Sequence, residues 1–439
     1  MGRSTLAARR WRLAASAIAL AATIGFAPDA SAAAPALQGS FPGATDAFFG
    51  YSAAVSGSTA AVGAWNDANG NGAVYVYAQS GSTWALQQQR PVVASDGASG
   101  DQFGYALALS GNTLLVGAPS RNQGLGAAYV FVQSGGTWVQ TQEITISNGS
   151  TNAGFGSSVA LSGSTAIIGA PGQLGMTGAA YVFTLGSTWQ LAQAFAGGGA
   201  PGDEFGFSVG VSPDATTAVV GAFGASNRTG AAYVLTYTGA SWTTPGQIGQ
   251  IILHASDGQP QDSFGYSVAA GNGEILVGAY QNTSTTPGAA YVFSGGGTSW
   301  SQQAKLVPMD GVSGDFFGYS LALSGNTALV GAYEKAGASG AAYLFTGSGA
   351  SWSQQAELSA PAAGQSFGYS VGLSGSNVAI GAISAASFAG ETYLYGPQGA
   401  PPPPPPSVPA LGHRANVLWL TLSLAVAGAI ASRRARGRA

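Results

Sequence analysis

Residues 317–358 read FGYSLALSGNTALVGAYEKAGASGAAYLFTGSGASWSQQAEL, and this stretch decides the fold. Its opening segment places Tyr319, Leu321 and Leu323 in alternation with small or polar residues, which is the period of two expected of a β-strand. Residues 327–332 form a run of small apolar residues, in which Gly331 predicts a close approach between neighbouring backbones. We therefore expect two strands joined by a tight turn in the first half of the stretch.

The second half of the stretch predicts two further strands. One contains Tyr343, Leu344 and Phe345, and the other begins at Trp352. Beyond Trp352 every second residue is polar, which predicts a half-exposed strand at the outside of the sheet. The whole stretch is expected to fold as one four-stranded sheet.

The same unit occurs seven times along the chain. A Phe-Gly pair opens each copy, at Phe49-Gly50, Phe103-Gly104, Phe155-Gly156, Phe205-Gly206, Phe264-Gly265, Phe317-Gly318 and Phe367-Gly368. The repeat is about 53 residues long, which suits a four-stranded propeller blade and is too long for a helical-pair or leucine-rich repeat. A sheet that is apolar on both faces cannot be stable alone, so the copies are expected to stack radially into a closed ring. The sequence therefore predicts an all-β fold, a seven-bladed β-propeller of four-stranded blades.

The seventh copy lacks the fourth strand with its tryptophan. Its third strand, residues 391–396, runs into Gly399 and a series of prolines. The segment Ala36-Leu37-Gln38, which precedes the first Phe-Gly pair, resembles the end of the fourth strand elsewhere, as in Ala304-Lys305-Leu306. We expect residues 33 to about 40 to complete the last blade, with Leu37 buried, and so to remove an open sheet edge.

The paired motifs make the chain similar to a known family. Gly-Ala pairs follow the Phe-Gly pairs, and the full Gly-Ala-Pro stands at Gly117-Ala118-Pro119 and Gly169-Ala170-Pro171. Over residues 46 to about 396 the sequence resembles the FG-GAP repeats of the integrin α-subunit propeller. The resemblance implies a propeller that is usually extracellular and acts without catalysis in adhesion or ligand binding. An inert surface or matrix scaffold is the second hypothesis, and a propeller enzyme is a remote third.

Composition restricts the chemistry further. The 439 residues include 69 glycines and no cysteine, so disulfides, thiolate zinc sites and cysteine nucleophiles are excluded. Between residues 33 and 400, five Lys or Arg residues face sixteen Asp or Glu residues, a net charge of −11. An acidic body of this kind argues against nucleic acid as a partner.

The two ends are predicted to be targeting segments. Residues 1–32 combine four arginines, an apolar stretch and Ala30-Ser31-Ala32, which is the pattern of a signal peptide. After the propeller at 33–397, residues 398–412 form a Pro-rich linker, with six prolines at 401–406, followed by Val408-Pro409-Ala410-Leu411, a motif that resembles a sorting signal. Residues 413–439 form an apolar transmembrane span and a basic tail.

This tail resembles the bacterial C-terminal sorting signals of the IPTL-CTERM and PEP-CTERM type, which implies a sorting protease as a partner. A plain single-span anchor is the alternative. In both cases we expect an exported protein at a bacterial cell surface or outside the cell, attached to the membrane transiently or permanently.

Calcium binding is the first candidate chemistry. The FG-GAP resemblance implies an Asp-x-Asn-x-Asp-Gly loop between the first two strands, but this chain has Ser-Gly-Asn-Thr or a similar sequence there. Oxygen ligands at alternate positions do occur at Asp67, Asn69 and Asn71, ahead of Gly72. This segment lies between the second and third strands, where an ordinary turn is the competing interpretation. We favour the turn over a calcium site, and no cofactor is expected.

An acid stands two residues before four of the Phe-Gly pairs, as Asp101, Asp203, Asp262 and Asp315. Because it recurs, we expect a structural role in which each carboxylate accepts N–H groups of its own turn. His254 is the single histidine of the propeller region and has no accompanying set of Ser and Asp that interrupts the repeat. The sequence therefore indicates no catalytic residues.

The loops after the second strands differ from copy to copy, and we predict that they form the binding surface, on the face that also carries the fourth-to-first connections. The candidate ligand contacts are Trp65, Arg121, Phe223, Arg228, Tyr280 and Tyr333. Aromatic side chains there can stack on a glycan or anchor a protein ligand. They can equally pack against a neighbouring blade, and the sequence leaves both roles open.

Overall fold

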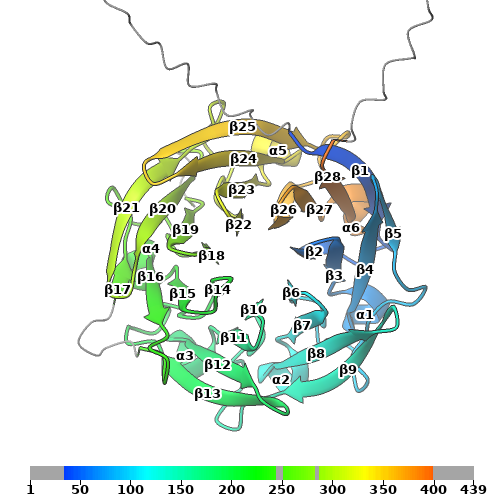
Figure 1. Ribbon diagram of the computed structural model, residues 1–439, viewed down its shortest axis with the longest axis horizontal. Coiled ribbons are helices and arrows are strands. Elements are labelled where there is room, and N and C mark those ends of the chain that lie inside the picture. Colours follow the sequence, from blue (N-terminus) through cyan, green and yellow to red (C-terminus); the bar gives the residue numbers. More distant parts are fainter. Residues whose placement is uncertain (1–33, 244–250, 282–285, 399–439) are drawn as a thin grey trace, which may run out of the picture. The chain divides into compact units, whose positions relative to one another are not determined.

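The computed structural model describes residues 34–243, 251–281 and 286–398. These residues form seven four-stranded sheets arranged around a central axis as the blades of a propeller (Figure 1). The predicted all-β, seven-bladed architecture is confirmed. No helix among the described residues is long and apolar enough to cross a membrane, and the predicted signal peptide and C-terminal span lie outside the described residues.

Each blade runs outward from the axis in sequence order, and the blades are numbered here by their Phe-Gly pairs. The innermost strands are β2 (Phe49–Ser56), β6 (Ala106–Ser110), β10 (Ser158–Ser162), β14 (Ser208–Val211), β18 (Ser267–Ala270), β22 (Ser320–Ser324) and β26 (Phe367–Ser374). The second strands are β3 (Thr59–Ala64), β7 (Thr113–Ala118), β11 (Thr165–Ala170), β15 (Thr217–Ala222), β19 (Glu274–Ala279), β23 (Thr327–Ala332) and β27 (Asn377–Ala382). The third strands are β4 (Ala73–Ser80), β8 (Ala127–Ser134), β12 (Ala179–Leu185), β16 (Ala231–Thr236), β20 (Ala289–Gly296), β24 (Ala341–Ser348) and β28 (Glu391–Gly396). The outermost strands are β5 (Thr83–Leu86), β9 (Thr137–Ile144), β13 (Trp189–Ala196), β17 (Ile251–Leu253), β21 (Ser299–Leu306), β25 (Ser351–Ser359) and, for blade 7, β1 (Ala36–Pro42).

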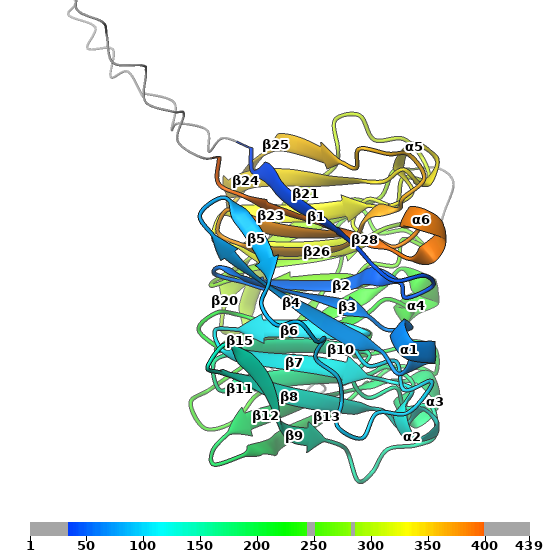
Figure 2. The same ribbon diagram turned by 90° about the vertical axis from the view of Figure 1, so that its right-hand side faces the viewer.

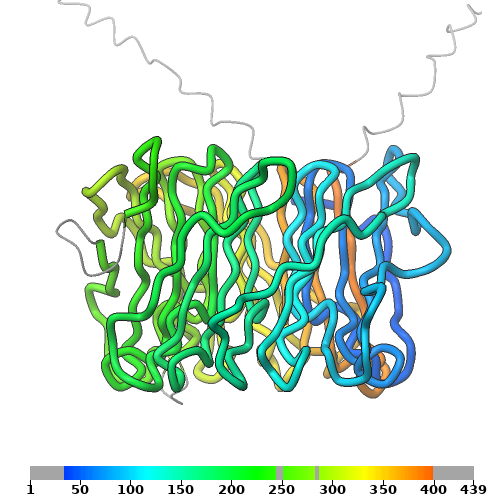
Figure 3. The backbone as a smooth tube through the Cα atoms, turned by 90° about the horizontal axis from the view of Figure 1, so that it is seen from below, coloured from blue at the N-terminus to red at the C-terminus, as the bar shows by residue number. Residues whose placement is uncertain are grey.

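A short helical turn joins the second and third strands in six blades of the described chain. These turns are α1 (Asp67–Gly70), α2 (Arg121–Gly124), α3 (Gln173–Met176), α4 (Ala225–Arg228), α5 (Lys335–Ala338) and α6 (Ala385–Phe388). Each contains two successive left-handed residues, such as Ala68 (φ 51°) and Asn69 (φ 62°) in α1. The turns gather at one end of the ring, while the strand hairpins lie at the other end (Figures 2 and 3). We call the first end the turn face.

The phenylalanine of each Phe-Gly pair is a core residue. All seven rings are buried to within 1% exposure, and each lies edge-on to the tyrosine of the third strand in its own blade, as in Phe317 against Tyr343 at 5.6 Å between ring centroids. Burying an aromatic ring of this size contributes about 2–3 kcal/mol. The motif therefore fixes the start of the first strand against the third.

The two motif glycines place adjacent blades in backbone contact. A Cβ atom on Gly331 of blade 6 would lie 2.0 Å from the carbonyl oxygen of Gly368 in blade 7, and the equivalent glycines of the other blades are equally crowded. Gly368 itself has a φ of 91°, a conformation that other residues rarely adopt. The predicted close approach at Gly331 is confirmed.

A serine at the start of the first strand adds an inter-blade hydrogen bond in six of the described blades. Ser320 Oγ donates to the carbonyl oxygen of Gly368 in the next blade at 2.7 Å, and Ser370 Oγ donates to that of Gly50 across the closure at the same distance. Blade 2 has Ala106 at this position and lacks the bond. Blade contacts therefore combine apolar packing with a repeated polar link.

The N-terminal strand closes the ring, as predicted. β1 pairs antiparallel with β28 and lies beside it in Figure 1, so the last blade takes its outermost strand from the start of the chain. Two details of the prediction are wrong: the strand covers Ala36–Pro42, and Leu37 is 48% exposed. Phe41 lies opposite Thr392, and the equivalent pair in blade 6 is Leu358 opposite Ala342. Phe41 is therefore the residue of β1 that points inward, and the centroid of its ring lies 4.3 Å from that of Tyr77.

Candidate functional site

The residue that follows each Phe-Gly pair lies at the axis of the ring, where its side chain faces the central channel. This position is aromatic in six blades and serine in one: Tyr51, Tyr105, Ser157, Phe207, Tyr266, Tyr319 and Tyr369. These residues, with Pro171, line a central cavity of about 330 Å³. We call them the axial collar.

Neighbouring aromatic rings of the collar touch one another. Tyr51 lies 4.8 Å from Tyr105 and 5.2 Å from Tyr369, measured between ring centroids. The series continues through Tyr319 and Tyr266 to Phe207, with successive separations of 5.0, 4.9 and 4.7 Å. Tyr105 and Phe207 are the ends of this arc, because Ser157 stands between them. The collar was not predicted from the sequence, although an aromatic residue follows six of the seven Phe-Gly pairs.

The predicted aromatic contacts support the collar from behind. Phe223 lies 4.5 Å from Phe207, Tyr280 lies 4.5 Å from Tyr266 and Tyr333 lies 4.4 Å from Tyr319. Phe223 and Tyr280 are less than a tenth exposed. The sequence left open whether these rings contact a ligand or pack within the protein, and these contacts show packing.

Trp65 is held in a similar way. Its ring stacks on Phe48 at 5.1 Å and meets the edge of Tyr51 at 5.9 Å. Trp65 and Tyr333 are both half-buried, so part of each residue remains accessible to solvent.

Burial keeps three of the collar hydroxyls, those of Tyr51, Tyr266 and Tyr319, in the neutral form. Burial, followed by the neighbouring tyrosines 105 and 369, raises the pKa of Tyr51 far above its ordinary value of 10.0. Burial likewise raises the pKa of Tyr266, and burial with the nearby Tyr266 and Tyr369 raises that of Tyr319. These three hydroxyls therefore stay protonated at physiological pH and present hydrogen-bonding groups without charge.

The gap in the arc at Ser157 opens onto polar side chains. A second cavity of about 330 Å³ lies there on the turn face and includes Gln102, Ser120 and Asn152 beside Tyr105 and Ser157. Ser120 Oγ donates to Gln102 Oε1, which fixes the orientation of the amide. Amide and hydroxyl groups thus lie next to an aromatic face, an arrangement that suits the binding of a polar, uncharged ligand.

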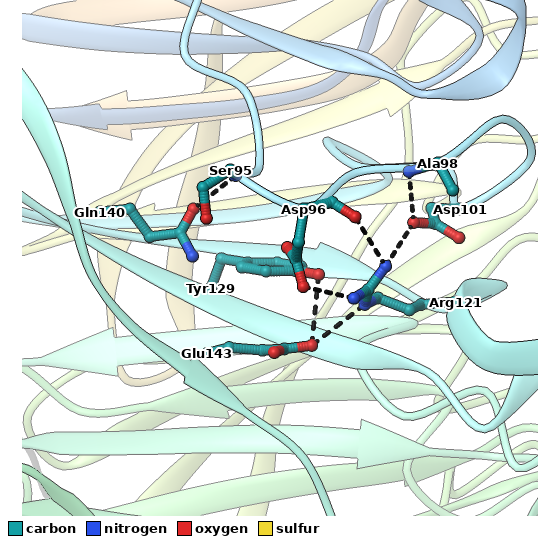
Figure 4. A network of polar contacts seen from close by, with 8 residues as sticks. All are labelled: Ser95, Asp96, Ala98, Asp101, Arg121, Tyr129, Gln140 and Glu143. Atoms are coloured by element: carbon teal, nitrogen blue, oxygen red, sulfur yellow. Dashed lines mark hydrogen bonds and ion pairs between the residues drawn. The ribbon is translucent and has the colours of Figure 1, made fainter.

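Arg121, a predicted ligand contact, is engaged inside the protein (Figure 4). Its Nε donates to Glu143 at 3.0 Å, its Nη1 donates to Asp101 at 2.9 Å, and its Nη2 pairs with Asp96. The side chain is 14% exposed. The guanidinium joins the turn of blade 2 to its outer strand and to the preceding connection, which is a structural role.

Arg228, the other predicted basic contact, lies over the second aromatic layer. Its guanidinium carbon is 4.9 Å from the centroid of Phe223, and Nη2 lies 3.4 Å from the hydroxyl of Tyr280. Burial raises the pKa of the nearby Glu204 and the charge of Arg228 opposes that shift. Between blades 4 and 5, therefore, a cation stacks on one aromatic ring and contacts the hydroxyl of a second aromatic residue.

The recurring aspartates hold their turns as expected. A carboxylate oxygen of Asp101 accepts the N–H of Ala98 at 2.8 Å, and Asp203, Asp262 and Asp315 make the same bond to the residue three positions earlier at 2.7–2.9 Å. Blade 3 has Ala153 at this position, and Gln173 Oε1 accepts the equivalent N–H, that of Ser150, instead. The prediction of a turn-forming role is confirmed.

The segment weighed for calcium folds as the same helical turn that other blades form with unrelated sequences. Asp67 accepts hydrogen bonds on both oxygens, from the N–H of Ala68 and from the hydroxyl of Tyr75, each at 2.7 Å. Asn69 is exposed, and Asn71 is half-buried. Within the described ranges, no three His, Asp or Glu side chains gather in a way that could hold a metal ion.

His254 lies just beyond β17, where its Nδ1 is 3.3 Å from the carbonyl oxygen of Gly230. This contact is with the backbone of the turn in blade 4, away from the collar. It places the histidine as a loop residue.

Comparison with known proteins agrees with the architecture. The family model described as FG-GAP repeat matches residues 42–77, 86–131, 138–183, 189–235, 249–293, 300–345 and 352–395. Each later match begins at the outermost strand of one blade and ends in the third strand of the next, so repeat and blade are out of phase by one strand. A search of curated proteins found no match. Seven repeats in one seven-bladed ring resemble the N-terminal propeller of integrin α subunits, and the chain belongs to the FG-GAP repeat family.

Proposed function

We propose that this protein is a non-enzymatic binding module for adhesion or ligand capture, and that its ligand sits on the turn face where the axial collar is open. The observation that carries the proposal is the single break in the aromatic arc at Ser157, flanked by the cavity that holds Gln102, Ser120 and Asn152. FG-GAP propellers commonly serve as ligand-binding or adhesion modules.

The ligand class follows from the groups that line the opening. Tyr105 offers an aromatic face, and the neighbouring side chains offer amide and hydroxyl groups without charge. Sugars and extended peptide segments both combine apolar faces with hydrogen-bonding groups, so a glycan or a protein is the expected partner. The predicted export of the chain would present this surface outside the cell, at the membrane or beyond it.

Two features of the described residues support binding over catalysis. The raised pKa values of Tyr51 and Tyr319 oppose the loss of their phenolic protons, which a tyrosine needs in order to act as a nucleophile or a general base. His254 contacts a backbone carbonyl and lies away from the collar.

An inert surface scaffold is the second candidate. It is favoured by the packing of Phe223 and Tyr280, which are used to support the collar and leave little aromatic surface on the turn face. A scaffold of this kind would need no ligand at Ser157.

The test uses a glycan array and a pull-down from surface and matrix proteins, with the wild-type protein and two variants. Ser157→Tyr completes the aromatic arc and closes the gap, so it should remove binding without a loss of thermal stability. Ser348→Tyr adds the same side chain at an exposed position of a hairpin, away from the turn face, and should leave binding unchanged. Binding that survives Ser157→Tyr would place the site elsewhere, and no binding by the wild type would favour the scaffold.

A further inference from the structure

A separate cavity of about 400 Å³ lies in blade 1, between its turn α1 and the connection that leads to blade 2. Its polar groups are Asp67, Asn71 and Tyr75, and its apolar wall includes Pro91, Val93 and Ala94. None of these residues belongs to the axial collar. The other blades show what normally occupies such a place.

Blades 5 and 6 repeat one arrangement of tyrosine, carboxylate and lysine. In blade 5, the Tyr291 hydroxyl donates to Asp257 at 2.8 Å, and Lys305 Nζ pairs with the same carboxylate at 2.6 Å. Lys305 Nζ also lies 5.4 Å from the centroid of the Tyr291 ring. The carboxylate and the ring face together stabilise the cation.

Blade 6 has the equivalent set in Tyr343, Asp310 and Lys335. The hydroxyl lies 3.0 Å from the carboxylate, Nζ pairs with that carboxylate at 2.5 Å, and Nζ lies 5.6 Å from the ring centroid. Arg121 plays the same part beside Tyr129 in blade 2 (Figure 4). In three blades, therefore, the chain supplies its own cation.

Blade 1 has the tyrosine and a carboxylate from a different position, Asp67, and no cation pairs with that carboxylate among the described residues. Tyr75 donates to Asp67 at 2.7 Å, which matches the bonds in blades 5 and 6. Asp67 itself begins α1, the position that Arg121 and Lys335 hold in their turns. Pro91 stands where Lys305 stands in blade 5, and Asp67 takes part in no ion pair among the described residues. The nearest base along the chain, Arg90, is exposed and does not line the cavity.

Shorter side chains also leave room between the turn of blade 1 and the connection that follows it. In blade 2, Leu125 and Ile146 close on Gly149, where an added Cβ would lie 3.4 and 3.2 Å from them. The residues at the same places in blade 1 are the shorter Asn71 and Ala94, which line the cavity. In blade 7 the tyrosine and carboxylate are Tyr393 and Glu391, and no base pairs with them among the described residues. There the Tyr393 hydroxyl also bonds to the amide oxygen of Gln365 at 2.7 Å, so an amide lies beside the pair.

We infer that the blade 1 cavity binds the ammonium or guanidinium group of a lysine or arginine side chain supplied by a partner protein. The charged group sits against the Asp67 carboxylate and the Tyr75 ring, as Lys305 does in blade 5. Each carboxylate oxygen accepts one hydrogen bond at present and has a second lone pair available. The aliphatic stem of the side chain packs on Pro91, Val93 and Ala94.

The experiment titrates the full-length protein, by calorimetry and ligand-detected NMR at low salt, with three probes: N-acetyl-arginine amide, N-acetyl-lysine amide and the neutral N-acetyl-citrulline amide. The two cations should bind and citrulline amide should bind at least about tenfold more weakly, because it lacks the charge that the carboxylate needs. A Gly-Gly-Arg-Gly-Gly peptide separates the two sources of the cation. Binding at least as tight as that of the free amide supports a protein side chain, whereas exclusion of the peptide would overturn that source and indicate a free amine.

Three variants locate the site. Asp67→Asn keeps the shape and should weaken the cationic probes about tenfold or more, and the double variant Asn71→Leu/Ala94→Ile copies the filled cavity of blade 2 and should abolish binding. Asp257→Asn, the matched change in a blade that is already occupied, should have no effect on probe affinity, and neither should Ser157→Tyr in the collar.

Equal binding of citrulline amide, or undiminished binding by Asp67→Asn or by the filled variant, would overturn the inference. Calcium binding that depends on Asp67, without binding of the arginine amide, would overturn it as well. Because Ser157→Tyr leaves this cavity intact, failure of the collar proposal and failure of this one are distinguishable.

Discussion

The closing strand β1 can be tested with one substitution that removes its inward side chain. Phe41→Ala deletes the ring that packs on Tyr77 in the core between blades 7 and 1. A fully buried Phe→Ala change costs about 3–5 kcal/mol, and because Phe41 is only partly buried we expect about 2 kcal/mol. Leu37→Ala, on the same strand, removes a side chain that is 48% exposed and should cost less than about 0.5 kcal/mol.

The measurement is the urea midpoint of both variants, with the slope of the unfolding free energy against urea compared to confirm that only stability has changed. Thermal melting is the less sensitive readout, because 1 kcal/mol shifts the midpoint by only about 1 °C in a domain this large. If Leu37→Ala costs as much as Phe41→Ala, the register of β1 on β28 is not the one described, and the argument that Phe41 fastens the ring fails.

Four further predictions follow from the packing between blades. Deleting residues 34–42 removes the six residue pairs between β1 and β28, whose backbone hydrogen bonds contribute about 1 kcal/mol each. The shortened protein should unfold at lower urea, and light scattering should detect association through the exposed edge of β28. A stable monomer would contradict the role of β1 in closing the ring. Gly331→Ala should cost about 3 kcal/mol or more, because its Cβ would lie 2.0 Å from a carbonyl oxygen, whereas Gly198→Ala, with open space around it, should be nearly neutral in the same urea titration. Ala106→Ser should add the missing inter-blade bond to Gly156 and raise the unfolding free energy by about 1 kcal/mol; no gain would mean that the bond has little net value. Although burial opposes its ionisation, hydrogen bonds from Lys335 and Tyr343 hold the pKa of Asp310 below its ordinary value. The stabilisation that the ionised carboxylate provides is therefore present above about pH 4 and is lost as the pH falls through that lower pKa. Asp310→Asn should make the urea midpoint depend less on pH between about 5 and 2.

The sequence was sufficient for the architecture because each step rested on a repeated local cause. The Phe-Gly spacing gave the blade count, alternation gave the strands, and the absent tryptophan strand pointed to closure by the N-terminus. The register of β1 was beyond such reasoning. Leu37 and Phe41 are both apolar, and which of them turns inward depends on the pairing with β28, including an irregularity between Leu37 and Gly39.

The candidate site was predicted only in part. The loops after the second strands do lie on the turn face, but the aromatic residues chosen there mostly support the collar. The surroundings of Arg121 were also beyond the sequence, which cannot show that three carboxylates from separate segments converge on one guanidinium. The collar itself was visible as an aromatic residue after six of the seven Phe-Gly pairs, and its meaning depended on knowing that this position faces the axis.

The one-strand offset between repeat and blade has a consequence for how such a protein can change over generations. Each FG-GAP unit brings the outermost strand of one blade and the three inner strands of the next, so a duplicated or lost unit alters the number of blades by one and leaves every sheet with four strands. The two strands that pair to close the ring, β1 and β28, lie at the two ends of the repeat array, so a unit gained or lost between them leaves both partners in the chain. Recombination within the gene can therefore change the number of blades without removing the strands that close the ring.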